Sequence, residues 1–169
     1  MKHKKEVICI SIIFIIQVLF QIVGSYCYGT FPEWMWSICD ALILVTPFIF
    51  GLGAGLICCL PNTISEIGWL IMKGYMGAFL HGIAFLLTVV VCGCLQIRLR
   101  KKEIHWYVIC FEVSLVLENF LYRLLRTVFL TSKTTQLTFL NLFQTNLSIG
   151  NIVCLFLLIF LLKRKKNIN

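Results

Sequence analysis

The chain has 169 residues, of which 60% are hydrophobic, and its mean hydropathy is +0.94. Soluble globular domains are only about 45–50% apolar, so this composition excludes an ordinary soluble domain and predicts a small helical membrane protein. The net charge of +8 comes largely from three basic clusters, at residues 2–5, 98–102 and 163–166, and such clusters flank membrane spans on the cytoplasmic side. This distribution favours contact with lipid headgroups and indicates no nucleic-acid partner.

Six apolar segments are long enough to cross a membrane as helices. We expect the spans at residues 7–24, 34–50, 52–72, 75–97, 105–130 and 139–162. The first segment could pass for a secretory signal, but its apolar run exceeds the usual core of about 7–15 residues and no small-residue cleavage site follows. Counting residues 34–72 as one span would place the 98–102 cluster outside, against the positive-inside rule. The sequence therefore predicts a single-domain, all-α bundle of six transmembrane helices in a prokaryotic cell membrane, with both termini cytoplasmic.

Polar side chains recur at helical spacing in the first two expected spans. Gln17 and Gln21 are four residues apart and share a face of the first. Trp36 and Asp40 share a face of the second, and the expected topology puts Asp40 in the outer third of the membrane. Because polar groups at that depth are costly in contact with lipid, we expect both faces to point into the bundle.

The third span carries the next polar face, and the fourth carries a single histidine. Asn62, Glu66, Trp69 and Lys73 follow spacings of four, three and four, which put them on one side of a helix. An acidic side chain in the middle of a span costs about 2.5–3.5 kcal/mol, so Glu66 needs a partner or a wet cavity. On the fourth span, small residues around His81 allow a neighbouring helix to approach closely.

The fifth span supplies a further polar face, with Asn119, Arg123 and Arg126 in line and Glu118 to one side. Together the faces on the second, third and fifth spans predict a pocket in the outer half of the membrane for a small polar ligand with a flat ring. The expected ligand-binding residues are Trp36, Asp40, Asn62, Glu66, Trp69, His81, Asn119 and Arg123. An aromatic vitamin with a carboxylate tail would suit tryptophan and arginine side chains.

Each of these residues also has a purely structural interpretation. Asp40 or Glu66 would then pair with Arg123 or Lys73 simply to hold helices together. By the same logic, His81 would form a hydrogen bond between helices without touching a ligand.

Neither catalysis nor metal binding is indicated by a motif. The chain has only three histidines and lacks His-Glu-x-x-His, Gly-x-Ser-x-Gly and a glycine-rich phosphate loop with lysine. Most of its nine cysteines lie within apolar runs, where cysteine acts as a small hydrophobe, and Cys92-Gly-Cys94 is too closely spaced for an ordinary zinc site. We therefore expect no enzyme activity, no catalytic residue, no metal, no cofactor and no disulfide.

Three stretches of the sequence resemble one known family. They are PFIFGLGAGLICCLPNTISE at residues 47–66, KGYMGAFLHGIAFLLTVVVCGCL at 73–95 and VSLVLENFLYRLLRTVFLTS at 113–132. They are similar to the glycine-rich turn before the third span, the glycine-bearing fourth span and the fifth span of the substrate-binding S components of energy-coupling factor (ECF) vitamin transporters. The first span has bulky residues where that family usually carries Ala-x-x-x-Ala.

The resemblance implies an import function. The chain would capture a vitamin or related micronutrient at the outer face, dock on a membrane-embedded coupling subunit driven by two ATPase subunits, and release the ligand inside. The alternative is a non-transport scaffold, because Gln17 and the segment Gly51-Leu-Gly-Ala-Gly55 also resemble the rod-shape-determining inner-membrane family. Such a scaffold would bind partners in cell-wall assembly and would need no ligand pocket.

Overall fold

All regular secondary structure in the described part of the chain is helical. A computed structural model describes residues 2–27, 33–99, 102–130 and 149–168. Its six helices are α1 (Lys2–Tyr26), α2 (Glu33–Phe50), α3 (Leu52–Lys73), α4 (Met76–Leu99), α5 (Ile104–Phe129) and α7 (Ile149–Ile168). This confirms the all-α prediction. The start of the sixth expected span, residues 139–148, lies outside the described residues.

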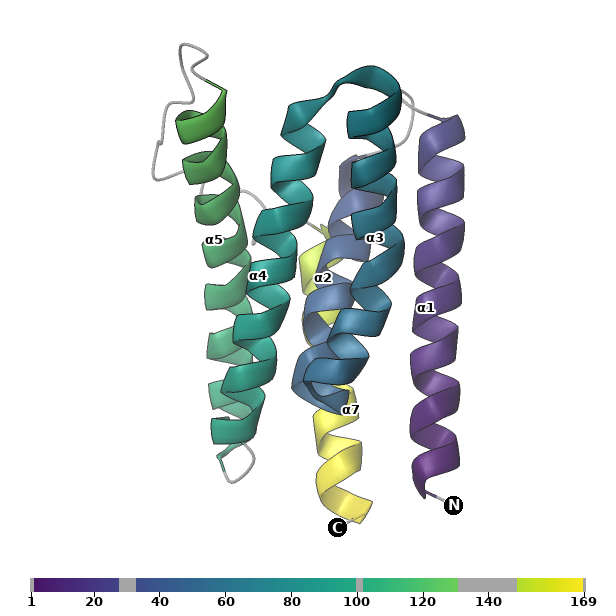
Figure 1. The fold of residues 1–169 in the computed structure, drawn as a ribbon. Coiled ribbons are helices and arrows are strands. Elements are labelled where there is room, and N and C mark those ends of the chain that lie inside the picture. Colours follow the sequence, from purple (N-terminus) through teal and green to yellow (C-terminus); the bar gives the residue numbers. More distant parts are fainter. Residues whose placement is uncertain (1, 28–32, 100–101, 131–148, 169) are drawn as a thin grey trace.

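The helices run up and down alongside one another, so that both termini lie at one end of the bundle (Figure 1). The end of α4 lies at this same end, whereas the turn between α3 and α4 lies at the opposite end. Residues 2–5, Arg98 and residues 163–166 therefore gather at the end that carries the termini. We call this the basic end and the other the distal end. This arrangement is the one that the positive-inside rule requires of a bundle inserted in a membrane.

Two glycines form the turns on either side of α3. Gly51 has a φ of 95° and Gly74 a φ of 65°, values that residues with a Cβ rarely adopt. At the end of α3, the Gly74 N–H donates to the Leu70 carbonyl (2.9 Å) and the Tyr75 N–H to the Trp69 carbonyl (3.4 Å). These bonds satisfy carbonyls that the helix leaves free at its C-terminus. The chain therefore reverses directly into α4.

α2 is the centre of the bundle. It packs against α1, α3, α4, α5 and α7, and residues 41–49 are all buried. Phe48 is fully buried and meets the rings of Tyr107 and Phe111 edge to face. α3 and α4 approach closely beside this core, since a Cβ on Gly93 would lie only 2.7 Å from the Leu52 side chain. The small residues of α4 thus serve the close packing expected of them.

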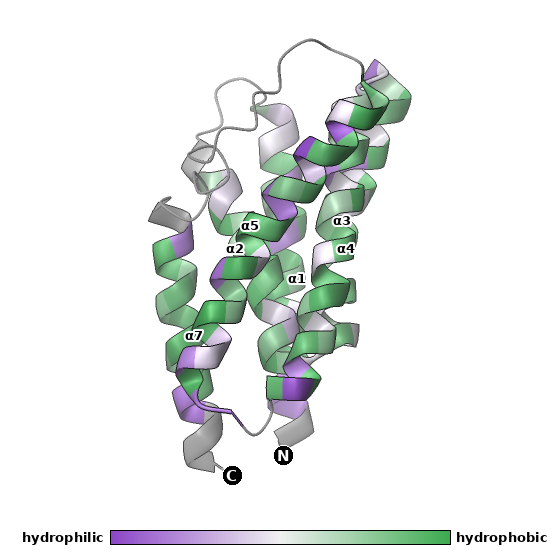
Figure 2. Ribbon diagram, turned by 90° about the vertical axis from the view of Figure 1, so that its left-hand side faces the viewer, coloured by the Kyte–Doolittle hydropathy of each residue, from purple (hydrophilic) through white to green (hydrophobic). Residues whose placement is uncertain are grey.

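Hydrophobic residues predominate along the helices (Figure 2), and many of the large ones are exposed. Three described helices, α1, α3 and α4, are long and apolar enough to cross a membrane, and residues Met35–Phe50 of α2 form a shorter apolar helix. Large aliphatic side chains of α1 are about half exposed, namely Ile8, Ile12, Ile15, Leu19 and Ile22. Such a surface is compatible with a membrane protein.

Candidate ligand-binding site

A cavity of about 300 Å³ lies in the distal half of the bundle. Side chains from α1, α2, α3, α4 and α5 line it. Six of the eight residues predicted from the sequence are among them: Trp36, Asp40, Asn62, Glu66, Trp69 and His81. The polar faces that the sequence predicted for α2 and α3 therefore line the same cavity. That they bind a ligand there stays a prediction.

The two residues expected from α5 do not line this cavity. Within the described part of the chain, the lining residue from α5 is Tyr122, and neither Asn119 nor Arg123 belongs to the lining. Gln21, Ser65 and Tyr75 also line the cavity. Gln21 was expected only to point into the bundle, whereas Ser65, Tyr75 and Tyr122 were not singled out.

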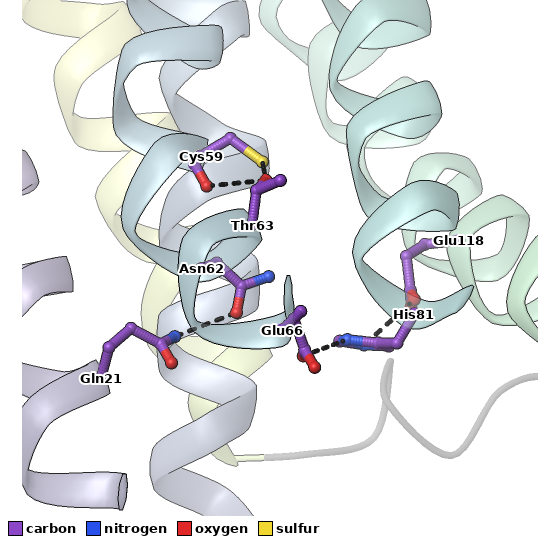
Figure 3. A network of polar contacts seen from close by, with 7 residues as sticks. All are labelled: Gln21, Cys59, Asn62, Thr63, Glu66, His81 and Glu118. Atoms are coloured by element: carbon purple, nitrogen blue, oxygen red, sulfur yellow. Dashed lines mark hydrogen bonds and ion pairs between the residues drawn. The ribbon is translucent and has the colours of Figure 1, made fainter. Parts of the chain in front are cut away.

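His81 stands between two acidic side chains, as Figure 3 shows. Its Nδ1 lies 3.0 Å from Glu66 Oε1 on α3, within hydrogen-bond distance. Its Nε2 lies 3.4 Å from Glu118 Oε1 on α5, a longer contact that is an ion pair by distance but lacks hydrogen-bond geometry. Both imidazole nitrogens therefore face carboxylates, and His81 links α3, α4 and α5.

Glu118 was expected beside the polar face of the fifth span and was not among the predicted ligand-binding residues. Its side chain is buried, with only 5% of the residue exposed, and Arg123 is near enough for its charge to act on the carboxylate. Arg123 thus acts on Glu118 through its charge and is not part of the cavity lining. The purely structural interpretation fits Arg123 and Glu118 better than it fits Glu66, whose partner is His81 rather than Arg123 or Lys73.

Asn62 joins α3 to α1 and keeps one donor unused. The Gln21 Nε2 donates to Asn62 Oδ1 at 3.0 Å, and the Asn62 residue is only 3% exposed. The Asn62 Nδ2 points away from Gln21 and has no hydrogen-bond partner among the described residues (Figure 3). A buried donor left unpaired costs about 1–3 kcal/mol, so this group is poised for an acceptor that enters the cavity.

Aromatic rings form much of the remaining wall. A Cβ on Gly24 would collide with Trp36 Cη2, so the glycine on α1 is what lets this indole pack there. Tyr122 stands edge-on to His81, with ring centroids 5.3 Å apart at 87°. Trp69 and Tyr75 are the other aromatic residues of the lining. Flat rings around a polar hollow are suited to stacking on a small ligand.

Asp40 is the acidic lining residue that no described side chain pairs with. It has no hydrogen bond or ion pair to another described residue, although its charge, like those of Glu66 and Glu118, acts on His81. Within the described residues, no group of three or more His, Cys, Asp or Glu side chains could hold a metal ion. The cavity therefore offers carboxylates, an imidazole, an amide and indoles, which are groups for recognition by hydrogen bonding, charge and stacking.

Comparison with known proteins finds no match to this chain, whether among family models, curated proteins or solved structures.

Proposed function

We propose that this protein is a membrane-embedded binding protein that captures a small polar ligand from the outer side of the membrane. In this proposal the cavity in the distal half of the bundle is the binding site. The observation that carries it is the convergence of unsatisfied polar groups on one hollow: within the described part of the chain, the Asp40 carboxylate has no hydrogen bond or ion pair, and the buried Asn62 Nδ2 has no acceptor. Buried polar groups are normally paired, so unpaired ones that line a cavity support a ligand that would pair them.

The orientation follows from the basic end. The proposal has six helices crossing the membrane, with the termini and the basic residues on the cytoplasmic side. The distal end, and with it the cavity, then faces outward. The supporting observation is that the described residues of the three basic clusters share one end although the clusters are far apart in the sequence.

The resemblance to S components supplies the next step of the proposal. A protein of that kind passes its ligand inward by docking on a membrane-embedded coupling subunit that works with two ATPase subunits. The chain itself would bind and release the ligand and would hydrolyse nothing. A vitamin or related micronutrient is the class of ligand that the resemblance implies.

Mass spectrometry of the purified protein tests the capture function. The full chain is isolated in mild detergent, and small molecules released by denaturation are compared between the unaltered chain and two variants. We expect one metabolite to accompany the unaltered protein and the Glu112→Gln variant, because Glu112 accepts from Asn151 and does not line the cavity. We expect the Trp69→Ala variant to lose it. If no metabolite accompanies the unaltered protein, the proposal fails.

A second experiment separates transport from the scaffold alternative. Cells that depend on this protein are supplied with the identified metabolite, and its uptake and the cell shape are both recorded for Glu66→Gln and Trp69→Ala. Loss of uptake at normal shape supports the import function, as does co-isolation of the chain with ATPase subunits. Loss of rod shape with uptake intact would favour the scaffold.

A further inference from the structure

We infer that the ligand of the distal cavity carries a positive charge, which sits against the Asp40 and Glu66 carboxylates and the adjoining aromatic rings. This inference rests on the proposed function, because it names the chemical class of molecule that the same cavity would hold. It replaces the expectation of a ligand with a carboxylate tail.

The described lining of the cavity has more acidic than basic groups. Among the described lining residues, the acidic groups are Asp40 and Glu66, and the basic group is His81. The imidazole is already held by Glu66 on one side and by Glu118, which is outside the lining, on the other. Three carboxylates therefore act on a single histidine, and among the described residues Asp40 has no hydrogen bond or ion pair of its own.

The arginines of α5 lie away from the cavity, although Arg123 was expected to bind the ligand. The Arg123 charge acts on Glu118, and the Arg126 charge acts on Tyr122. Neither arginine belongs to the described lining of the cavity. A ligand carboxylate would thus meet Asp40 and Glu66 with no guanidinium to receive it, and like charges that close repel strongly in a poorly hydrated site.

A cation in this cavity would gain favourable contacts with carboxylates and with aromatic rings. A buried carboxylate loses its hydration, and an opposite charge at contact distance is the usual compensation. Trp36, Trp69, Tyr75 and Tyr122 add aromatic lining to the same hollow. Indole and phenol rings attract an organic ammonium group through their electron-rich faces, with tryptophan the strongest. Carboxylates and aromatic rings together are therefore the chemistry of an organic cation site.

An independent observation shows that the ligand is more than a bare ion. The buried Asn62 Nδ2 has no acceptor within the described part of the chain, and its residue lines the cavity. A metal ion or ammonium cannot satisfy an N–H donor, since it offers no lone pair. The ligand we infer is consequently an organic molecule with a cationic group for Asp40 and Glu66 and a hydrogen-bond acceptor for Asn62.

Calorimetric titration of the full chain in lipid nanodiscs tests the charge, after any co-purified molecule has been washed out. The probes are benzyltrimethylammonium, benzyl alcohol and benzoate, which share a ring and differ in charge. We expect saturable binding of the cation and no detectable binding of benzoate. Asp40→Asn should weaken binding of the cation at least about tenfold, because the neutral amide keeps the shape but loses the attraction. Glu112→Gln should bind it like the unaltered chain.

If Asp40→Asn does not fold, Trp69→Ala takes its place, since it removes an aromatic wall without touching a charge. The inference is overturned if benzoate or benzyl alcohol binds as well as the cation, if none of the three binds, or if the cation binds Asp40→Asn and Trp69→Ala undiminished. The proposed function has a separate test, the molecule released from the purified protein. A released acid would overturn only the cationic ligand, whereas release of nothing would overturn the capture function.

Discussion

The two halves of this bundle are built from the same helices yet packed in opposite ways. In the half near the basic end, α2 is enclosed from residue 41 to residue 49, and Phe48 and Phe111 are completely buried. In the distal half, the same helix presents Asp40 to a cavity of about 300 Å³. Along α2, the change from a polar cavity to a solid core therefore takes place between residues 40 and 41.

Polar groups behave differently in the two halves as well. In the closed half, Thr46 and Thr88 donate to the backbone carbonyl four residues earlier, at 2.9 Å each, so their hydroxyls are satisfied within their own helix. In the hollow half, Asp40 and the Asn62 Nδ2 have no such partners among the described residues. The comparison teaches that polarity alone does not mark a site in an apolar bundle. An unsatisfied atom alone does not mark one either, since Gln17 Oε1 and Asn151 Oδ1 also lack a hydrogen-bond partner among the described residues. Asp40 and Asn62 differ from these because they line a cavity.

The largest expected effect is on the closed core. Phe48→Ala should lower the free energy of unfolding by about 3–5 kcal/mol, because a fully buried ring is removed from between Tyr107 and Phe111. Trp69→Ala should cost clearly less, since that indole borders a hollow. Unfolding in mixed micelles, followed by circular dichroism as denaturing detergent is added, measures both. Equal losses would contradict the division of the bundle into a solid and a hollow half.

A smaller effect is expected where α3 and α4 touch. A Cβ on Gly93 would lie 2.7 Å from the Leu52 side chain and 2.9 Å from its Cα, so Gly93→Ala should cost about 1–3 kcal/mol by forcing the helices apart. Gly53, also helical, has nothing within 4 Å of the same position. Gly53→Ala should therefore be neutral or stabilising, by up to about 1 kcal/mol. The same unfolding assay tests the pair, and a reversal of their order would refute the close contact.

The histidine bridge should contribute a comparable amount in the distal half. His81→Leu removes the group that stands between Glu66 and Glu118, and we expect a loss of about 1–3 kcal/mol from the unpaired carboxylates. Adding Glu66→Gln to His81→Leu should recover part of that loss, because one of the two buried charges disappears. Thermal unfolding in nanodiscs compares the three proteins. A double variant no more stable than His81→Leu would mean that the acidic pair was not the source of the loss.

The smallest effect is expected from the bond between α1 and α3. Hydrogen bonds between transmembrane helices average about 0.6 kcal/mol and reach about 1.7 kcal/mol. A double-mutant cycle with Gln21→Leu and Asn62→Leu should give a coupling free energy in that range, since the two amides are 3.0 Å apart. A coupling free energy of zero would mean that this hydrogen bond does not help to hold α1 against the bundle.

Much of the distal site was predictable because helical spacing fixes which residues share a face. Asn62, Glu66 and Trp69 lie on one side of α3 by periodicity alone, and they line the cavity together. Placing Asp40 and His81 in the same half required only the order of the spans and the basic clusters. Local rules were therefore enough for α2, α3 and α4.

The rotation of α5 was not predictable from polarity. Asn119 and Arg123 were chosen because they are polar, whereas the structure turns Tyr122 toward the cavity and Glu118 toward His81. A signal for this was present, because Phe111, Leu115, Glu118 and Tyr122 follow spacings of four, three and four. The buried Phe111 and Leu115 set which side of α5 faces inward, and this apolar face carries Glu118 and Tyr122 with it.

Thiol labelling of Ser65→Cys in intact cells tests the central claim most directly, since Ser65 lines the cavity and the claim is that this cavity opens outward to bind a ligand. The unaltered chain, whose own cysteines include the exposed Cys27, serves as the background. We predict that a membrane-impermeant maleimide labels the variant above this background from outside the cell, and that the metabolite identified with the purified protein slows the labelling. Labelling only in inside-out membrane vesicles, or labelling that the metabolite leaves unchanged, would contradict the account.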